Sequence, residues 1–166
     1  MTRMVRVAIL TASDKGAAGQ RDDTSGALAR SRCEAAGHQV VASAVLPDDR
    51  AAIAAQLREW ADQGLADVVL TTGGTGLTAR DVTPEATLDV AERMVPQLPT
   101  ALALEGLKKT PYAALSRGVA VLRRNTLIVN LPGSPKAVAE GLDVLLPLFP
   151  HIGDLLAGPV EHDSQP

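Results

Sequence analysis

A glycine-rich turn near the middle of the chain has the composition of a phosphate-binding loop. Residues 71–76 read Thr-Thr-Gly-Gly-Thr-Gly, between a valine-rich run and a proline suited to the first turn of a helix. Three glycines within four residues leave several backbone N–H groups free to bind an anion at a strand end. The spacing matches neither the dinucleotide fingerprint nor the P-loop. The alternative is a plain strand-to-helix connection that needs positive φ angles.

A second turn of the same kind lies near the end of the chain. Residues 130–136 read Asn-Leu-Pro-Gly-Ser-Pro-Lys, which places Ser134 as a helix N-cap and a proline at the first helical position. Lys136 then falls in the first turn, where the helix dipole already provides positive charge. A bound phosphate would explain this lysine, because N–H groups and ammonium would converge on it. The alternative is an ordinary helix start with a solvated lysine.

Two aspartates are placed to hold a cation beside these turns. Asp48 follows a predicted strand, and Asp81 follows the central glycine turn. Carboxylates repel a phosphate unless a cation lies between them, and Mg²⁺ takes one or two carboxylates, phosphate oxygens and water. The alternatives are a helix N-cap for Asp48, and a cap or a surface pair with Arg80 for Asp81.

The elements that must position these residues alternate between strands and helices. This pattern predicts an α/β fold, a three-layer α/β/α sandwich whose mostly parallel sheet has one antiparallel strand or hairpin near the C-terminus. The expected strands cover residues 5–11, 38–46, 66–72, 118–122 and 126–130. The expected helices cover residues 24–36, 48–64, 84–95, 100–108, 134–148 and 152–157, with a loop over 13–19. Inward-facing side chains are expected at Leu28, Ala35, Ile53, Leu57, Trp60, Leu88, Ala91 and Val95.

Helix starts are expected at residues that cap well. Thr24 or Ser25 should cap the first of these helices, and Thr83 should cap the helix that follows the glycine turn, with Pro84 at its first position.

Composition limits the class of protein. The 166 residues suit one domain over residues 1–160, followed by a frayed polar tail over 161–166. Aromatic residues make up only 2% and the net charge is −3, which argues against a nucleic-acid partner. No apolar run is long enough for a membrane span or a signal peptide, so we expect a cytoplasmic protein without a membrane partner. The residues alone therefore indicate an α/β protein that handles Mg²⁺ and phosphates by positioning and electrostatics.

Longer motifs resemble one protein family. Residues 71–87, Thr-Thr-Gly-Gly-Thr-Gly-Leu-Thr-Ala-Arg-Asp-Val-Thr-Pro-Glu-Ala-Thr, resemble the signature of the MogA/MoaB family of molybdenum-cofactor biosynthesis, which includes the G domain of gephyrin. Three more matches follow the family's order, at residues 46–49 (Leu-Pro-Asp-Asp), 115–118 (Leu-Ser-Arg-Gly) and 130–136. Together they span nearly the whole chain.

This resemblance implies a reaction and its partners. The terminal phosphate of molybdopterin would attack the α-phosphate of ATP with the help of Mg²⁺, releasing pyrophosphate and adenylyl-molybdopterin. Family members form trimers, so a homotrimer is expected, with transient contact to the enzyme that inserts molybdate.

The resemblance also implies roles for residues at matching positions. Asp48 and Asp81 resemble the family's two essential aspartates, which would serve Mg²⁺ and the phosphates. Ser13 and Asp14 would border the site of the pterin phosphate, and Ser116 would help to hold a ligand. A cradle for phosphate or pterin groups would come from Gly73, Gly74, Thr75 and Gly76. The nucleotide pocket would be lined by Pro132, Gly133 and Ser134.

Two other functions are compatible with these motifs. Some MoaB-like relatives bind molybdopterin without adenylylating it, and the related CinA-type domain carries a similar glycine turn on another nucleotide-processing enzyme. CinA-type chains are usually longer than this one. Residues 81–87, which begin with Asp81, resemble the sequence of the MogA-like relatives that are active adenylyltransferases.

Overall fold

Six strands form one sheet in the computed structural model, which describes residues 3–158. The sheet order is β2-β1-β3-β6-β5-β4. The strands are β1 (Arg6–Ala12), β2 (Gln39–Leu46), β3 (Val68–Thr72), β4 (Arg93–Met94), β5 (Ala120–Arg123) and β6 (Thr126–Leu131). The helices are α1 (Asp14–Ala17), α2 (Thr24–Ala35), α3 (Arg50–Asp62), α4 (Thr83–Val90), α5 (Gln97–Leu107), α6 (Pro135–Leu145) and α7 (Phe149–Leu156), with 3₁₀ turns η1 (Pro111–Leu115) and η2 (Leu146–Leu148). The predicted frayed tail, residues 161–166, lies outside the described residues.

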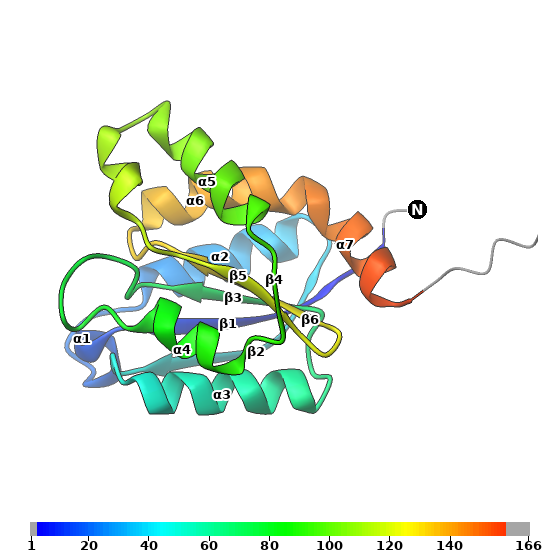
Figure 1. The fold of residues 1–166 in the computed structure, drawn as a ribbon, viewed down its shortest axis with the longest axis horizontal. Coiled ribbons are helices and arrows are strands. Elements are labelled where there is room, and N and C mark those ends of the chain that lie inside the picture. The colour runs from blue at the N-terminus through cyan, green and yellow to red at the C-terminus, as the bar shows by residue number, and fades with distance from the viewer. Residues whose placement is uncertain (1–2, 159–166) are drawn as a thin grey trace, which may run out of the picture.

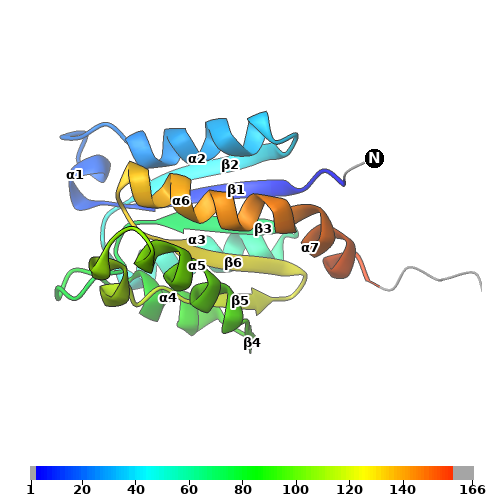
Figure 2. The same cartoon turned by 90° about the horizontal axis from the view of Figure 1, so that it is seen from above.

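The direction of the strands confirms the predicted fold class. Strands β2, β1, β3 and β6 pair in parallel, whereas β5 is antiparallel to both β6 and β4. Helices α2, α5 and α6 cover one face of the sheet, and α3 and α4 cover the other (Figures 1 and 2). The result is a three-layer α/β/α sandwich with the predicted hairpin of β5 and β6.

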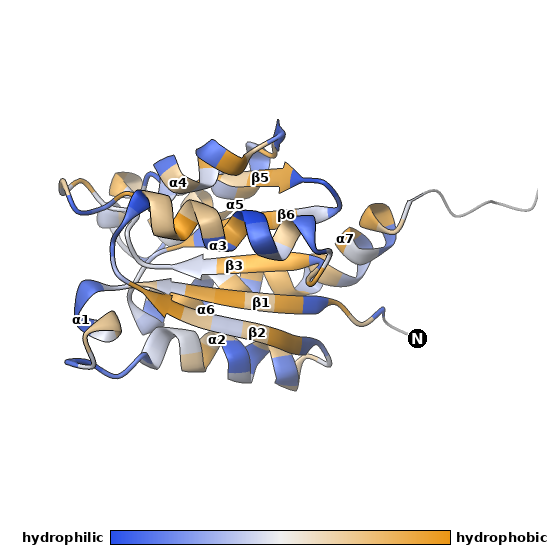
Figure 3. Ribbon diagram, turned by 90° about the horizontal axis from the view of Figure 1, so that it is seen from below, coloured by the Kyte–Doolittle hydropathy of each residue, from blue (hydrophilic) through white to orange (hydrophobic). Residues whose placement is uncertain are grey.

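Alternating side chains divide the core between the two faces. Val7 and Ile9 pack under the α2 and α6 face, whereas Ala8 and Leu10 pack on the α3 and α4 face. Because both faces are covered, the central strands are apolar along most of their length. Strand β1 is accordingly coloured hydrophobic over much of its course (Figure 3).

The helix faces were predicted correctly for α3 only. Ile53, Leu57 and Trp60 are buried as expected. The prediction was wrong for Ala35 and Leu88, which are exposed, and Leu28 is only partly buried. The buried faces of α2 and α4 instead include small and polar residues, because the hydroxyls of Thr87 and Ser25 find hydrogen-bond partners inside. These buried residues are Ser25, Gly26, Ala29 and Cys33 on α2, and Thr83, Pro84, Ala86, Thr87 and Val90 on α4.

Several predicted element boundaries were also wrong. The helix expected over 84–95 ends at Val90, because Ala91 turns extended and residues 93–94 pair with β5 as the unpredicted strand β4. Ala91 and Val95 are partly buried outside that helix. The expected loop over 13–19 contains α1, capped by Ser13. The helix expected over 134–148 ends at Leu145, where η2 takes over, and α5 begins at Gln97 rather than residue 100.

The caps predicted for α2 and α4 lie one or two residues from the observed caps. Asp23, not Thr24 or Ser25, caps α2, since its carboxylate accepts the N–H of Gly26 at 2.9 Å. Thr83 is the first residue of α4 rather than its cap, a position held by Val82 without a side-chain hydrogen bond. Both carboxylate and hydroxyl caps suit such positions, so sequence alone could not choose between neighbours.

The strand order creates a crevice at one end of the sheet. The chain leaves β1 towards β2 on one side, whereas β3 lies on the other side of β1. In open α/β sheets such a switch point leaves a crevice at the carboxyl ends of the strands, where ligands bind. In the described part of the chain, no helix is long and apolar enough to cross a membrane.

His38 ties the beginning of the chain to the base of α7. It is 7% exposed, its Nδ1 accepts the N–H of Val5 at 3.1 Å, and its ring meets Phe149 edge-on at 5.3 Å. Burial lowers the pKa of His38 below its usual 6.5. The neutral ring is therefore the folded form, because a protonated Nδ1 cannot accept the N–H of Val5.

We expect this histidine to make the free energy of unfolding depend on pH. As the pH falls, the unfolded chain takes up a proton on this histidine before the folded chain does. The contribution of His38 to the free energy of unfolding is therefore complete above about pH 6.5, and it is lost progressively as the pH falls towards the lowered folded-state pKa. Urea unfolding between pH 5 and 8, in about unit steps, should show this slope for wild type and for the control His151→Gln. His38→Gln should lack it, and an unchanged slope in that variant would contradict the assignment.

Candidate active site

A cavity of about 460 Å³ occupies the crevice between β1 and β3. Its wall is built from the loops that follow β1, β2, β3 and β6 and from the start of α2. Of the residues singled out from the sequence, it brings together Ser13, Asp48, Gly73, Gly74, Asp81, Gly133 and Ser134. We call it the acidic cavity, because Asp22 and Asp23 add to the two expected aspartates while Arg21 is the one basic residue among the described residues that line it.

The first glycine turn needs glycine for steric reasons. Gly73 has a φ of +85°, and a Cβ on it would lie 2.4 Å from the carbonyl oxygen of Ala12. Gly74 has a φ of +69°. The N–H of Gly73 donates to the carbonyl of Leu131 at 3.2 Å, so this group belongs to the fold and does not serve a ligand. The alternative interpretation, a strand-to-helix connection that needs positive φ angles, is therefore correct in part.

The two glycine turns touch each other across the crevice. A Cβ on Gly133 would lie 3.3 Å from the Cα of Gly73. The second turn is held in place by α2, because the hydroxyl of Ser25 donates to the carbonyl of Gly133 at 2.6 Å. Ser134 caps α6 as predicted, accepting the N–H of Ala137 at 3.2 Å.

Asp48 forms a reciprocal pair with Asp14 and not a helix cap. The N–H of Asp14 donates to Asp48 Oδ2 at 3.1 Å, and the N–H of Asp48 donates to Asp14 Oδ1 at 2.9 Å. The cap of α3 is Asp49, which accepts the N–H of Ala52 at 2.8 Å. Asp48 Oδ1 lies near Gly74, at 3.2 Å from the position of a Cβ there. Its carboxylate is thus directed by the backbone of α1 towards the glycine turn.

Asp81 caps a turn while it lines the acidic cavity. Its Oδ2 accepts both the N–H and the hydroxyl of Thr78 at 2.9 Å. The expected alternative of a pair with Arg80 is wrong, since Arg80 donates instead to both carboxylate oxygens of Asp14, at 3.0 and 2.8 Å. Arg80 thereby bridges the loop after β3 to the loop after β1.

The charges in the acidic cavity are not balanced. Burial raises the pKa of Asp48, and the nearby charges of Asp14 and Asp81 raise it further. The Arg80 guanidinium instead lowers the pKa of Asp14. An acid whose charge is disfavoured by neighbouring acids is a site that a cation would stabilise.

The donors present suit a metal that brings some ligands of its own. No three His, Cys, Asp or Glu side chains converge as a metal-ligand set within residues 3–158. Mg²⁺ needs fewer, because it keeps waters and binds substrate phosphates. A further polar atom is also available: Thr83 Oγ1 is buried without a hydrogen-bond partner among the described residues, 2.3 Å from the position of a Cβ on Gly74. Asp48, Asp81 and this hydroxyl fit the surroundings of a hydrated Mg²⁺.

A second cavity, of about 390 Å³, adjoins the first between β6, α5, η1 and α6. It takes in Thr75, Gly76, Ser116 and Pro132 of the predicted set, and Ser134 lines both cavities. Its other walls are mainly apolar, with Leu102, Ala103, Tyr112, Ala113 and Leu115 among them. We call it the apolar cavity. The part formed by α5 and η1 was not predicted from the sequence, because the residues of α5 that line it form no motif.

Two predicted residues line neither cavity. Asp14 acts through its bonds to Asp48 and Arg80. Lys136 is exposed on the first turn of α6, which agrees with the solvated-lysine alternative. Conversely, Asp23 and Ser25 were missed as wall residues, although the run Asp22-Asp23-Thr24-Ser25 at a helix start signalled them.

Comparison with known proteins identifies the family. A protein-family model described as a probable molybdopterin binding domain matches residues 8–151 of this chain. The chain belongs to this molybdopterin-binding family. The chain is similar to a molybdopterin adenylyltransferase of Helicobacter pylori, 35% identical over 159 residues that cover 93% of this chain and 89% of the relative. The Drosophila molybdenum cofactor synthesis protein cinnamon is 44% identical over 92% of this chain, which spans only 26% of that relative.

Solved structures of the molybdopterin-binding family share this fold. The molybdopterin biosynthesis enzyme MoaB of Thermus thermophilus is 49% identical with a TM-score of 0.87, over 94% of this chain and 98% of that one. A MogA structure is 36% identical with a TM-score of 0.86, over 91% of this chain and 99% of that one. These matches confirm the resemblance to MogA and MoaB. A CinA protein of Thermoplasma acidophilum, at 19% identity and a TM-score of 0.66, shares the fold alone.

Substituting Gly73 tests whether the turn needs glycine for space as well as for φ. Gly37 is a matched control, because its φ is +88° and nothing lies within 4 Å of a Cβ there. Gly37→Ala should cost about 1 kcal/mol from φ alone. Gly73→Ala should cost roughly 2 kcal/mol more, since the methyl group meets the carbonyl of Ala12. Urea unfolding measures the free energy of unfolding of both variants. Equal losses would mean that the close approach of Gly73 to the carbonyl of Ala12 adds nothing to the cost.

Neutralising Asp48 should stabilise the metal-free protein. Because the pKa of Asp48 is raised, its charge opposes folding at pH 7, and Asp48→Asn should raise the urea midpoint. The gain should shrink as the pH falls through the folded-state pKa and vanish below the usual 3.8. Asp14→Asn should do the opposite at pH 7, because Arg80 loses a favourable partner. A lower midpoint for Asp48→Asn in EDTA-treated protein would refute the imbalance of charge.

Proposed function

We propose that the chain is a molybdopterin adenylyltransferase, a nucleotidyltransferase that moves AMP from Mg-ATP to the phosphate of molybdopterin. One observation carries the proposal: an acidic cavity lined by the two expected aspartates and by glycines of both turns adjoins an apolar cavity. Both volumes fall in the usual range for small-molecule sites. The names of relatives such as the H. pylori adenylyltransferase support this activity.

The two cavities divide the substrates by their chemistry. The acidic cavity suits the phosphates with their metal, whereas the apolar cavity suits a planar ring, which both molybdopterin and ATP contain. Ser134 lines both cavities, so a ligand that passes it can place its phosphates in one and its ring in the other. We propose that Ser13 borders the pterin phosphate, that Asp14 acts there through its bonds to Asp48 and Arg80, and that Pro132, Gly133 and Ser134 line the nucleotide pocket.

The reaction is a displacement at phosphorus that needs no nucleophile from the protein. An oxygen of the molybdopterin phosphate forms a bond to the α-phosphorus of ATP, and the bond from this phosphorus to the bridging oxygen breaks. Pyrophosphate leaves with the electron pair. The contribution of the chain is to align the two phosphates and stabilise the charge that develops.

Asp48 and Asp81 are the residues we propose for holding Mg²⁺. When bound, this ion would neutralise charge on the phosphate oxygens and on the leaving pyrophosphate. The backbone of Asp14 directs the carboxylate of Asp48, and Thr78 directs that of Asp81, so both are oriented before substrate arrives. Such orientation avoids reorganisation during the reaction.

The family likeness supports three further parts of the proposal: a homotrimer, a cytoplasmic setting, and transient contact with the enzyme that inserts molybdate. Sedimentation at several protein concentrations tests the first of these.

A binding protein without turnover is the second candidate. The likeness to MoaB, 49% identical in the T. thermophilus structure, motivates this candidate, because some MoaB-like relatives bind molybdopterin without adenylylating it. Such a protein would bind molybdopterin but release no pyrophosphate.

Pyrophosphate release from Mg-ATP, with and without molybdopterin, decides between these functions. Asp81→Asn should lower molybdopterin-dependent release by about 100-fold or more, because an amide keeps the bond to Thr78 but lacks the charge that Mg²⁺ needs. Molybdopterin binding should be largely retained.

Asp49→Asn is the matched control. Asp49 neighbours Asp48 and caps α3, a role that asparagine fills almost as well. This control should keep full release. Undiminished release by Asp81→Asn would remove Asp81 from the mechanism, and binding without release by wild type would establish the binding protein.

A further inference from the structure

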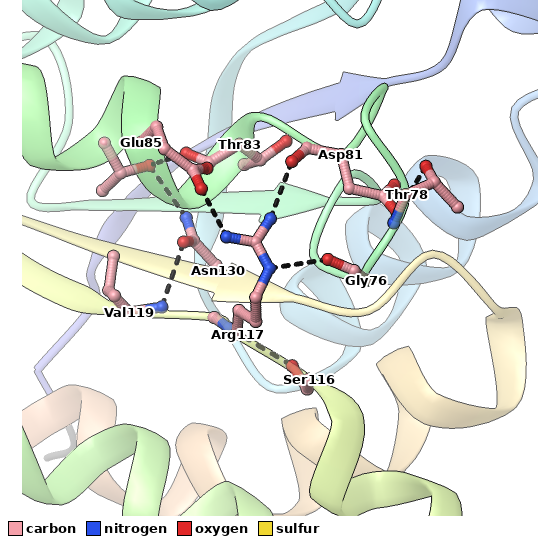
Figure 4. Close-up of polar contacts among 11 residues, drawn as sticks. Gly76, Thr78, Asp81, Thr83, Glu85, Ser116, Arg117, Val119 and Asn130 are labelled. Carbon is pink, nitrogen blue, oxygen red and sulfur yellow. Dashed lines mark hydrogen bonds and ion pairs between the residues drawn. The ribbon is translucent and has the colours of Figure 1, made fainter.

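The Arg117 side chain spans the two ends of the loop that follows the central glycine turn. Its Nε donates to the carbonyl of Gly76 at 2.7 Å, and its Nη2 donates to the carbonyl of Asp81 at 2.7 Å. Figure 4 shows the guanidinium between these two carbonyls. The backbone N–H of Arg117 also donates to the carbonyl of Thr75, at 2.9 Å. One residue between η1 and β5 therefore contacts three residues of this loop.

Glu85 completes the surroundings of the guanidinium. Its Oε1 pairs with Arg117 Nη1 from the first turn of α4, and the arginine lowers the pKa of this carboxyl group. The guanidinium thus joins the beginning of the loop, the end of the loop and α4 (Figure 4). Its fixed geometry sets the separation between Gly76 and Asp81, which a flexible ammonium cannot do.

The loop that Arg117 holds serves both cavities. Asp81 lines the acidic cavity, whereas Thr75 and Gly76 line the apolar cavity. The neighbours of Arg117, Ser116 and Gly118, also line the apolar cavity. Arg117 itself is on neither wall, and its side chain is 33% exposed. It is therefore placed to act through the loop and not on a substrate.

We propose that Arg117 is a positioning residue for adenylyl transfer: it holds Gly76 and Asp81 at the separation that aligns the aspartate with the phosphates. This inference rests on the proposed function. A residue of this kind affects the rate of the chemical step through geometry, and a displacement of about 1 Å can cost about 100-fold.

Arg117→Lys tests the proposal against a matched control. Arg123 has a comparable structural role on β5, because it pairs with Asp62 and donates to the carbonyl of Val90, but it contacts no residue of the glycine loop in the described structure. Arg117→Lys should lower kcat by about 10- to 100-fold with KM for ATP changed less than about threefold. Arg123→Lys should lower the melting temperature by a similar amount and leave kcat unchanged.

Hydrogen exchange provides a readout that does not depend on turnover. In ligand-free protein, Arg117→Lys should speed the exchange of backbone amides in residues 75–82 by about tenfold or more, because the loop opens more often. Arg123→Lys should not change exchange there. Unchanged exchange in Arg117→Lys overturns the proposal that Arg117 holds the loop.

Chemical rescue separates positioning from a loss of fold. Arg117→Ala should recover part of its kcat in millimolar guanidinium, because the free ion can take the place between the two carbonyls, whereas Arg123→Ala should gain nothing. Equal losses of kcat in the two lysine variants, or no rescue, would overturn the role of Arg117. A wild type that releases no pyrophosphate overturns the proposed function instead, while the exchange experiment still decides whether Arg117 holds the loop.

Discussion

Three parallel strands end so close together that their loops must be built around backbone without side chains. A Cβ on Gly73 would press on the carbonyl of Ala12, and a Cβ on Gly133 would crowd the Cα of Gly73. This convergence of β1, β3 and β6 brings the loops after these strands into one crevice. Asp48 joins them from the loop after β2 through its reciprocal bonds with Asp14. These glycines are therefore a condition for the fold as well as part of the cradle that we propose for phosphates.

A buried polar network supports the crevice from below. Asn130 Nδ2 donates to the hydroxyls of Thr71 and Thr87 at 2.9 and 3.0 Å, and its Oδ1 accepts the N–H of Val119 at 3.1 Å. These bonds join β3, β6 and α4 and the chain that leads into β5. Networks that are satisfied in this way favour a single arrangement of the core, because any other arrangement leaves polar groups unpaired. The base of the site is thus rigid, while its rim depends on bonds between exposed residues such as Arg80 and Asp14.

The sequence predicted what depends on local pattern and missed what depends on contact across the fold. Apolar periodicity placed Ile53, Leu57 and Trp60 correctly, and the Ser-Pro start placed the cap of α6. It missed β4, which exists only because two residues pair with β5. It offered Asp48 as an alternative cap for α3, but the carboxylate of Asp48 accepts the N–H of Asp14, which lies 34 residues away in the chain. It gave no role to Arg117, whose partners lie more than 30 residues away in the chain.

The two edges of the sheet differ in how readily a strand of another chain could pair with them. The edge formed by β4 is only two residues long, begins with an arginine and is followed closely by Pro96. The opposite edge, β2, runs for eight residues and contains neither a charge nor a proline. Short, charged or proline-bearing edges resist pairing with other chains, whereas long uncharged edges invite it. Aggregation of partly unfolded molecules should therefore begin at β2, and a lysine at the exposed Ser43 would protect that edge without touching the crevice.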